Sequence, residues 1–237
     1  MNGTAHWHRS APAPTIIRLS ETIDYFRETI TVKLYTFDPA PNPRRLALFM
    51  QHKGIEIETQ QIDIMAGEQL GDDFRAVNPE CTLPTLVLDD GSILTEVIGI
   101  CTYLEELYPD KPLLGTTPAE KARVISWDHK LFVGVMMSIA SMLRNRSEAF
   151  RDRALPGALD VPQIPELVDR GLLMLQDILP KLDAHLGENT WMAGDNMTFA
   201  DIDLMVSVGF MAWVKQSVPE DCVNLKDWYE RVTTQLG

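Results

Sequence analysis

The first half of the chain alternates strand-like and helical patterns. Residues 31–37 are mostly β-branched or aromatic, and residues 44–53 carry apolar side chains at helical spacing up to Gly54, which is typical of a helix C-cap. Apolar and polar residues then alternate over residues 55–62. This order predicts a strand, a helix and a second strand, and the two strands of such a βαβ unit run parallel.

A hairpin and a helix are predicted next. After a polar connection over residues 65–79, an apolar run covers residues 83–88 and is followed by an Asp-Asp-Gly turn and a second short strand. Residues 96–108 return to helical spacing, and prolines and a glycine then break the pattern. We therefore place an α/β domain at residues 31–110.

Strand signals disappear in the second half of the chain. Long amphipathic segments, which predict the helices of a bundle, cover residues 118–143, 165–186, 199–213 and 225–235. Three prolines and one glycine at residues 155–165 predict a break between two of these helices. The expected fold class is thus α/β plus all-α, with the order βαβ-ββα followed by an all-helical domain at residues 118–237.

The opening residues fit neither pattern. Residues 1–30 are predicted to be an N-terminal extension, in which residues 1–13 carry mainly small, polar and proline residues without periodicity and residues 20–30 favour a short helix. The acidic residues Glu21 and Glu28 argue against an organelle transit peptide, which is rich in arginine and poor in acid.

Charge and apolar content narrow the function classes. Acidic residues outnumber basic ones by 34 to 21, so the net charge of −13 disfavours nucleic acid and anionic membranes as partners and favours a small molecule. The apolar runs are shorter than a bilayer span and no secretion signal is recognised, which predicts a soluble, cytoplasmic protein. Three cysteines without metal-ligand spacing indicate a reducing compartment and no bound metal.

A loop motif gives the most specific functional signal. Residues 78–86 read Asn-Pro-Glu-Cys-Thr-Leu-Pro-Thr-Leu. This motif, in the order of elements predicted above, resembles the glutathione transferase family, and the resemblance extends from Val32 to the C-terminus. It implies a thioredoxin-like domain that binds glutathione, with a cis peptide bond between Leu83 and Pro84. A cis bond would present the N–H and C=O of Leu83 to an extended peptide, whereas the alternative is an ordinary trans proline that begins a strand.

The resemblance implies further glutathione contacts. Glu96 takes the position of the acid that binds the γ-glutamyl ammonium group. The backbone N–H of Val97, where the family usually has serine, is expected to bind the neighbouring carboxylate at a helix N-terminus. Gln69 aligns with a contact to the glycyl carboxylate and Thr82 with another glutathione contact. The structural alternatives are a helix-start acid at Glu96 and solvated loop side chains at the other two positions.

Catalysis requires a hydrogen-bond donor near the glutathione sulfur, because the thiolate is the nucleophile and a free thiol has a pKa of about 8.5. Ala40 stands where serine-type members of the family carry their hydroxyl. We expect Asn42 to donate its amide N–H to the thiolate, with Thr36 as the reserve hydroxyl. Asn42 followed by Pro43 is also typical of a helix N-cap. Tyr35 is expected to be a core aromatic.

The second substrate's pocket is predicted after the first strand and on the first long helix of the bundle. Its lining is expected to comprise Phe37, Asp38, Met136, Met137, Ala140 and Arg144. Methionines at helical spacing are also typical of core filling. Arg144 and Arg146 can attract an anionic substrate, with a solvated helix face or an interdomain ion pair as the alternative.

A capping box marks the start of one predicted helix. Thr198 is the expected N-cap, Asp201 follows three residues later, and Met197 is expected to pack on Ile202. The glutathione transferase family carries this box at the start of a buried helix, so we interpret it as a folding signal.

These features favour a glutathione S-transferase, an enzyme whose bound thiolate attacks a hydrophobic, electrophilic small molecule in a detoxification role. Conjugation, reductive ether cleavage and dehalogenation share this nucleophile and stay open. The rival class is a non-catalytic glutathione- or ligand-binding protein, which Ala40 and Val97 favour. Disulfide exchange is disfavoured because no cysteine occupies residues 35–45. The resemblance also suggests a homodimer in which the α/β domain of one chain faces the helical domain of the other.

Overall fold

The computed structural model describes residues 31–236, so the predicted extension and its helix at residues 20–30 lie outside the described residues. Four strands of the described part form one sheet in the order β2-β1-β3-β4. They are β1 Lys33–Thr36, β2 Glu58–Gln61, β3 Thr85–Val87 and β4 Ile93–Leu94. β1 and β2 are parallel, whereas β3 is antiparallel to both β1 and β4. The predicted βαβ unit and hairpin are confirmed.

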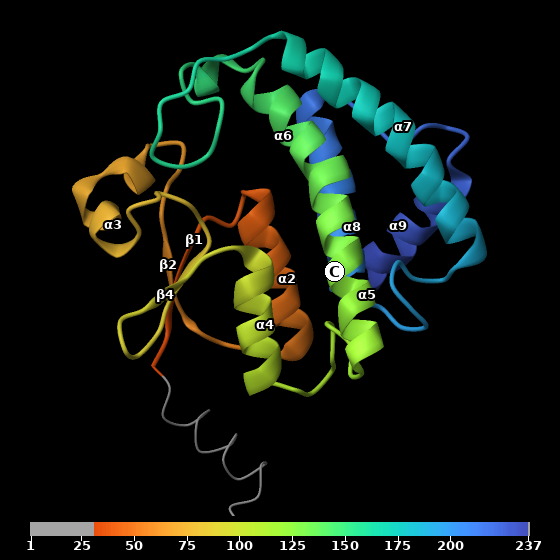
Figure 1. Cartoon of the computed structure of the whole chain (residues 1–237), viewed down its shortest axis with the longest axis horizontal. Helices are drawn as coiled ribbons and strands as arrows, with labels where there is room; N and C mark the ends of the chain where they lie inside the picture. Colours follow the sequence, from red (N-terminus) through yellow and green to blue (C-terminus); the bar gives the residue numbers. More distant parts are fainter. Residues whose placement is uncertain (1–30, 237) are drawn as a thin grey trace, which may run out of the picture. The chain divides into compact units, whose positions relative to one another are not determined.

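Helices cover both faces of this sheet (Figure 1). The helices α2 (Pro41–Lys53) and α4 (Val97–Leu107) lie on one face, and the short helix α3 (Asp72–Val77) lies on the other. Alternation along β1 explains the two layers, because Leu34 is buried in the core shared with α2 and α4 while the next side chain, Tyr35, packs edge-on against Phe74 of α3.

The helix α3 corrects the prediction of a purely polar connection over residues 65–79. Phe74 is the only fully buried residue of this six-residue helix, which a 3-10 turn at Glu68–Leu70 precedes. A helix with one buried side chain has no apolar periodicity, so the sequence pattern could not predict it.

The start of α2 also differs from the prediction. The helix begins at Pro41 instead of residue 44, because proline is well suited to a first turn whose N–H groups have no intrahelical partner. Its C-terminus is confirmed: Gly54 adopts the left-handed conformation, with a φ of 71°.

The second half is helical, as predicted. It comprises α5 Pro118–Leu131, a π-helical turn Phe132–Met136, α6 Met137–Arg144, a 3-10 turn Glu148–Phe150, α7 Glu166–Glu188, α8 Phe199–Phe210, a 3-10 turn Met211–Val214 and α9 Val223–Leu236. The predicted helix over residues 118–143 is therefore interrupted by the π-helical turn. Among the described helices, none is both long and apolar enough to span a membrane.

The capping box of α8 is confirmed. Thr198 and Asp201 form both of its hydrogen bonds, and ten of the twelve residues of α8 are buried. Asp201 also accepts hydrogen bonds from the Met192 N–H (3.0 Å) and from Trp228 Nε1 of α9 (3.1 Å). Burial raises the pKa of Asp201, and these hydrogen bonds oppose that shift. The box therefore anchors α9 and the loop before α8 as well as the helix it begins.

Two buried ionic groups connect α2 to its neighbours. The Arg45 guanidinium contacts Asp203 of α8 and Asp128 of α5, the latter at 2.8 Å. Lys53, at the other end of α2, pairs at 2.7 Å with Glu105 of α4. Glu105 also accepts two backbone N–H groups from the connection between α4 and α5, at 2.8 and 2.9 Å. Charged side chains thus specify how the α/β half meets the helical half.

Candidate functional site

The strand register brings the predicted glutathione residues to one end of the sheet. Continuing the antiparallel register of β1 and β3 by two residues places Leu83 opposite Phe37. Continuing that of β3 and β4 by two residues places Pro84 opposite Glu96. The helices α2 and α4 both begin close to this end of the sheet, so the positive ends of their dipoles point toward the same region. The free N–H groups belong mainly to α4, because residues 41 and 43 of α2 are prolines.

The peptide bond between Leu83 and Pro84 is cis, as predicted. Leu83 lies just before β3, and neither its N–H nor its C=O forms a hydrogen bond with any residue of the range 31–236. Buried or half-buried backbone groups are nearly always paired. Leu83, which is half-buried, therefore presents one donor and one acceptor that suit a strand-like peptide.

The start of α4 lies open beside this residue. Glu96 is the N-cap of α4 with a φ of 61°, an uncommon conformation for a residue other than glycine. Its exposed side chain makes no capping hydrogen bond. A free carboxylate and uncapped helix amides thus lie next to each other, an arrangement that suits a zwitterionic group with one ammonium and one carboxylate.

Gln69 and Thr82 differ in how their polar groups are occupied. The Gln69 Oε1 atom is buried without a hydrogen-bond partner in the part of the chain that the structure describes. The Thr82 Oγ1 atom accepts a hydrogen bond from Asn78 Nδ2 at 3.2 Å, which leaves the hydroxyl proton available to a ligand. Both side chains therefore retain unused hydrogen-bonding capacity.

Asn78 organises the loop and was not predicted to do so. It is fully buried, and its Nδ2 atom also donates to the Thr82 carbonyl (3.1 Å) and to Thr85 Oγ1 (3.0 Å). Its Oδ1 atom accepts the Glu80 N–H at 3.0 Å. The Asn-Pro pair at the start of the motif was the available signal, because asparagine commonly bonds to backbone groups a few residues away.

Asn42 does not cap α2, so that prediction was wrong. The N-cap is Ala40, which makes no side-chain hydrogen bond, and Asn42 lies one residue inside the helix. Its Oδ1 atom accepts a hydrogen bond from Arg45 Nη1 at 3.2 Å. Its Nδ2 atom has no hydrogen-bond partner within residues 31–236. Thr36, the reserve hydroxyl, is only 4% exposed and follows the buried alternation of Leu34.

The residues predicted to line the second substrate's pocket are not equally accessible. Phe37 is half-buried, and the exposed Asp38 forms two hydrogen bonds with Gln61, at 3.2 and 2.8 Å. Met136 is 3% exposed and belongs to the hydrophobic core. Met137 and Ala140, on α6, are half-buried.

Arg144 supports the loop between α6 and α7. Its Nη1 atom donates to the Arg153 carbonyl at 2.9 Å, and its guanidinium lies 4.6 Å from the Phe150 ring. Burial, together with the charge of Arg153, lowers the pKa of Arg144 to about 10. Within the described residues its guanidinium bonds to a backbone carbonyl and not to a carboxylate.

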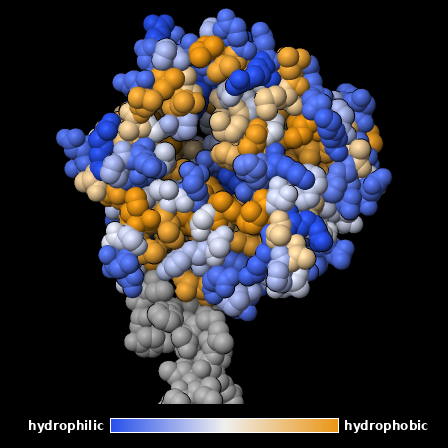
Figure 2. Space-filling model, in the orientation of Figure 1, coloured by the Kyte–Doolittle hydropathy of each residue, from blue (hydrophilic) through white to orange (hydrophobic). Residues whose placement is uncertain are grey.

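The same loop reaches the glutathione motif. A Cβ atom added to Gly157 would lie 3.3 Å from the carbonyl oxygen of Glu80. Figure 2 shows the surface hollowed near the start of α2, below this loop. The loop therefore borders the region where the predicted residues converge.

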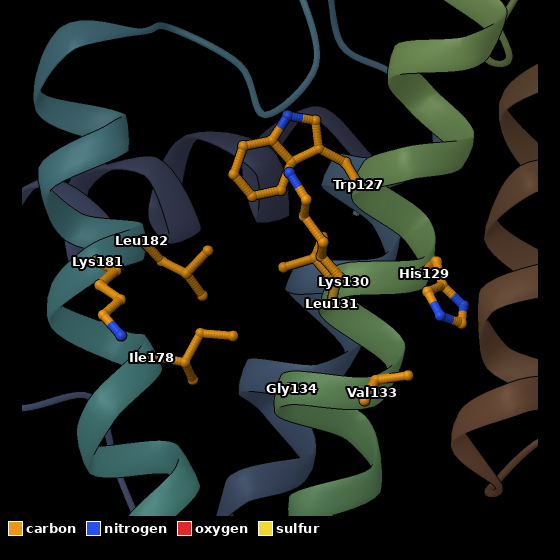
Figure 3. Close-up of a pocket in the computed structure, with 9 residues that line it drawn as sticks. All are labelled: Trp127, His129, Lys130, Leu131, Val133, Gly134, Ile178, Lys181 and Leu182. Atoms are coloured by element: carbon orange, nitrogen blue, oxygen red, sulfur yellow. The ribbon is translucent and has the colours of Figure 1, made fainter.

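A separate groove lies between α5 and α7, with a volume of about 430 Å³ (Figure 3). Its lining is mainly apolar with lysines at the edge, and comprises Trp127, His129, Lys130, Leu131, Val133, Gly134, Ile178, Lys181 and Leu182. Figure 3 shows side chains of both helices pointing into it, while His129 and Val133 point to the other side of their helix. None of the predicted site residues lines this groove, so it is distinct from the site at the end of the sheet.

Comparisons with known proteins agree with this geometry. Residues 40–107 match the family model of the glutathione S-transferase N-terminal domain, and residues 131–235 match that of the C-terminal domain. Glutathione S-transferase 2 of Saccharomyces cerevisiae is 27% identical over 204 residues, covering 84% of each chain. Maleylacetoacetate isomerase of Pseudomonas aeruginosa is 25% identical over 183 residues, covering 73% of this chain and 78% of the relative.

A solved structure shows the same architecture. The crystal structure of a glutathione S-transferase domain-containing protein from Marinobacter aquaeolei VT8 has a TM-score of 0.78 and 29% identity, covering 86% of this chain and 98% of that one. Both domain models match in the order that the fold requires, and the cis bond lies where the motif predicted it. The chain therefore belongs to the glutathione S-transferase family.

Proposed function

We propose that this glutathione transferase binds glutathione as an extended peptide at the end of its sheet, with Leu83 pairing with the cysteinyl residue. The single observation that carries this proposal is that the backbone N–H and C=O of Leu83 form no hydrogen bond with any residue of the described range 31–236. Glu96 binds the γ-glutamyl ammonium group, and the Val97 N–H binds the neighbouring carboxylate. The hydroxyl proton of Thr82, which is free because Oγ1 accepts from Asn78, supports its proposed contact. At Gln69 the amide NH₂ group, and not the buried oxygen, would donate to the glycyl carboxylate.

In this proposal Asn42 stabilises the thiolate. Its Nδ2 group is unpaired within residues 31–236, and the positive end of the α2 helix dipole lies beside it. A hydrogen bond to a charged acceptor is worth about 1.5–3 kcal/mol, enough to move the thiol pKa by roughly one to two units. The buried position of Thr36 makes its hydroxyl the weaker candidate donor.

Asn42→Ala is expected to lower kcat about 10-fold at neutral pH, because less of the bound glutathione is ionised. The measurement is steady-state kinetics with an activated aryl halide at saturating glutathione. Arg44→Ala, at the exposed neighbouring position on α2, is the matched control and should leave kcat unchanged. Unchanged kcat in Asn42→Ala, together with a loss in Thr36→Ala, would assign the donor to the hydroxyl.

The electrophile is proposed to enter the hollow below the α6–α7 loop. Half-buried Phe37, Met137 and Ala140 provide apolar surface, and Arg144, which has no carboxylate partner in the described part, favours a substrate with an anionic group. The chemistry is attack of the thiolate on an electrophilic carbon. Conjugation, ether cleavage and dehalogenation all begin with this step and are distinguished by which products form.

We further propose that the enzyme is a cytoplasmic homodimer and that the groove between α5 and α7 belongs to its interface. The groove is mainly apolar, and Val133 at its edge is 45% exposed. Contiguous exposed apolar surface commonly marks protein contacts. A second copy of the chain would cover it.

Val133→Glu is expected to weaken this dimer at least ~10-fold, because it places an unpaired charge in an apolar interface. Sedimentation equilibrium measures the dissociation constant. Leu173→Glu is the matched control, since Leu173 is 66% exposed on α7 but does not line the groove. Equal dissociation constants for Val133→Glu and the parent chain would exclude the groove from the interface.

A further inference from the structure

We infer that Arg45 is a positioning residue for the transferase reaction: it orients the Asn42 amide so that the NH₂ group faces the glutathione sulfur. This inference rests on the proposed role of Asn42 as thiolate donor. Arg45 itself is 4% exposed and does not reach the ligand, so it acts only through Asn42.

The Arg45 guanidinium is held from three sides. Its Nε atom donates to Asp203 Oδ1, its Nη2 atom to Asp128 Oδ1 at 2.8 Å, and its Nη1 atom to Asn42 Oδ1 at 3.2 Å. Phenylalanine rings of the π-helical turn and of α8 lie 5.5 and 5.4 Å from its Cζ atom. Every nitrogen of the planar group has an acceptor, so the guanidinium has a single orientation.

This arrangement determines which way the Asn42 amide points. A guanidinium can only donate hydrogen bonds, so the amide oxygen must face Arg45 and the NH₂ group must face the opposite side. The Nδ2 atom has no partner within residues 31–236 and is free to meet an acceptor such as a thiolate. The charged donor on the oxygen also polarises the amide and strengthens its N–H groups as donors.

The carboxylates that hold Arg45 belong to the helical half. Asp128 lies on α5 and Asp203 on α8, whereas Asn42 and Arg45 lie on α2 of the α/β half. The helical domain therefore sets the orientation of a donor in the glutathione domain. A merely structural ion cluster would hold the two halves together without affecting the ionisation of the bound thiol.

A double-mutant cycle tests the inference. The variants are Asn42→Ala, Arg45→Lys and the pair together, and the readout is the pKa of enzyme-bound glutathione, measured by the ultraviolet absorbance of its thiolate as a function of pH. Lysine keeps the positive charge but lacks the planar group whose three nitrogens donate to Asn42, Asp128 and Asp203. Each single substitution should raise the bound thiol pKa by about one unit, and the double variant should show no further rise beyond Asn42→Ala. Arg44→Lys, the exposed neighbour, should leave it unchanged.

The outcomes separate this inference from the proposed function. An unchanged pKa in Asn42→Ala overturns the donor itself. A pKa raised by Asn42→Ala but not by Arg45→Lys, or effects that add in the double variant, overturns only the positioning role.

A second variant keeps the test valid where Arg45→Lys does not fold. Arg45→Met with Asp128→Leu and Asp203→Leu removes the whole buried cluster without leaving an unpaired charge. It should raise the bound thiol pKa to the value in Asn42→Ala. A parental pKa in the folded triple variant overturns the inference.

Discussion

Replacing Arg45 with leucine is expected to lower the free energy of unfolding by about 3–5 kcal/mol, because it leaves the buried carboxyl groups of Asp128 and Asp203 without a cation. Burial already raises the pKa of Asp203 well above its usual range, and the charge of Arg45 opposes that shift. Burial by itself lowers the pKa of Arg45, but the two acids outweigh it and raise the pKa. Urea denaturation followed by circular dichroism measures the loss.

Two controls define the cause of this effect. Arg151→Ala breaks an exposed ion pair with Glu148 and is expected to cost less than about 1 kcal/mol. The triple apolar replacement of Arg45, Asp128 and Asp203 is expected to recover most of the stability, because no buried charge remains. A triple variant as unstable as Arg45→Leu would show that lost packing, and not an unpaired charge, is responsible.

Glu96→Gln is expected to raise the dissociation constant of glutathione about 10- to 100-fold, since a hydrogen bond between charged partners is worth about 1.5–3 kcal/mol. The φ of 61° at this position is kept, because glutamine differs from glutamate only at the end of the side chain. The value of kcat at saturating glutathione should change little, since the proposed contact of Glu96 is with the ammonium group and not with the reacting sulfur. Isothermal titration calorimetry measures the affinity.

An analogue of glutathione without its amino group distinguishes a direct contact between Glu96 and the ammonium group from a loss of affinity with another cause. The parent enzyme should bind this analogue as weakly as Glu96→Gln binds glutathione, and the variant should lose nothing more. Glu106→Gln, at another exposed acid of α4, is the matched control. If removing the amino group weakens binding equally in the parent and in Glu96→Gln, Glu96 does not bind the amine.

Local patterns were sufficient for much of the fold. β-branched and aromatic residues marked β1, alternation marked β2, and the Asp-Asp-Gly turn marked the hairpin. Gly54 marked the end of α2, and the Thr198 box marked the start of α8. Each of these signals depends on a few consecutive residues, whose conformational preferences act within one turn or strand. The helix α3 was not predicted, because a single buried side chain, Phe74, produces no periodicity.

The candidate site was likewise predicted where local sequence specifies it and missed where distant residues do. The cis bond at Leu83 and the position of Glu96 follow from a contiguous motif and the turn after it, so the sequence predicted both. The structure places these residues at one end of the sheet. The prediction that Asn42 caps α2 was wrong, because the helix begins one residue earlier, at Pro41. The Asn42 amide oxygen instead accepts a hydrogen bond from Arg45.

The sequence by itself determined the order of strands and helices, the main helix termini and the peptide-binding motif, because these depend on interactions between near neighbours. Only the tertiary structure decided the environment of Arg45, whose acidic partners lie 83 and 158 positions away. No local pattern specifies which distant carboxylates meet a buried cation. That choice depends on how the helices of the two halves pack, and it determines the direction in which the Asn42 amide points.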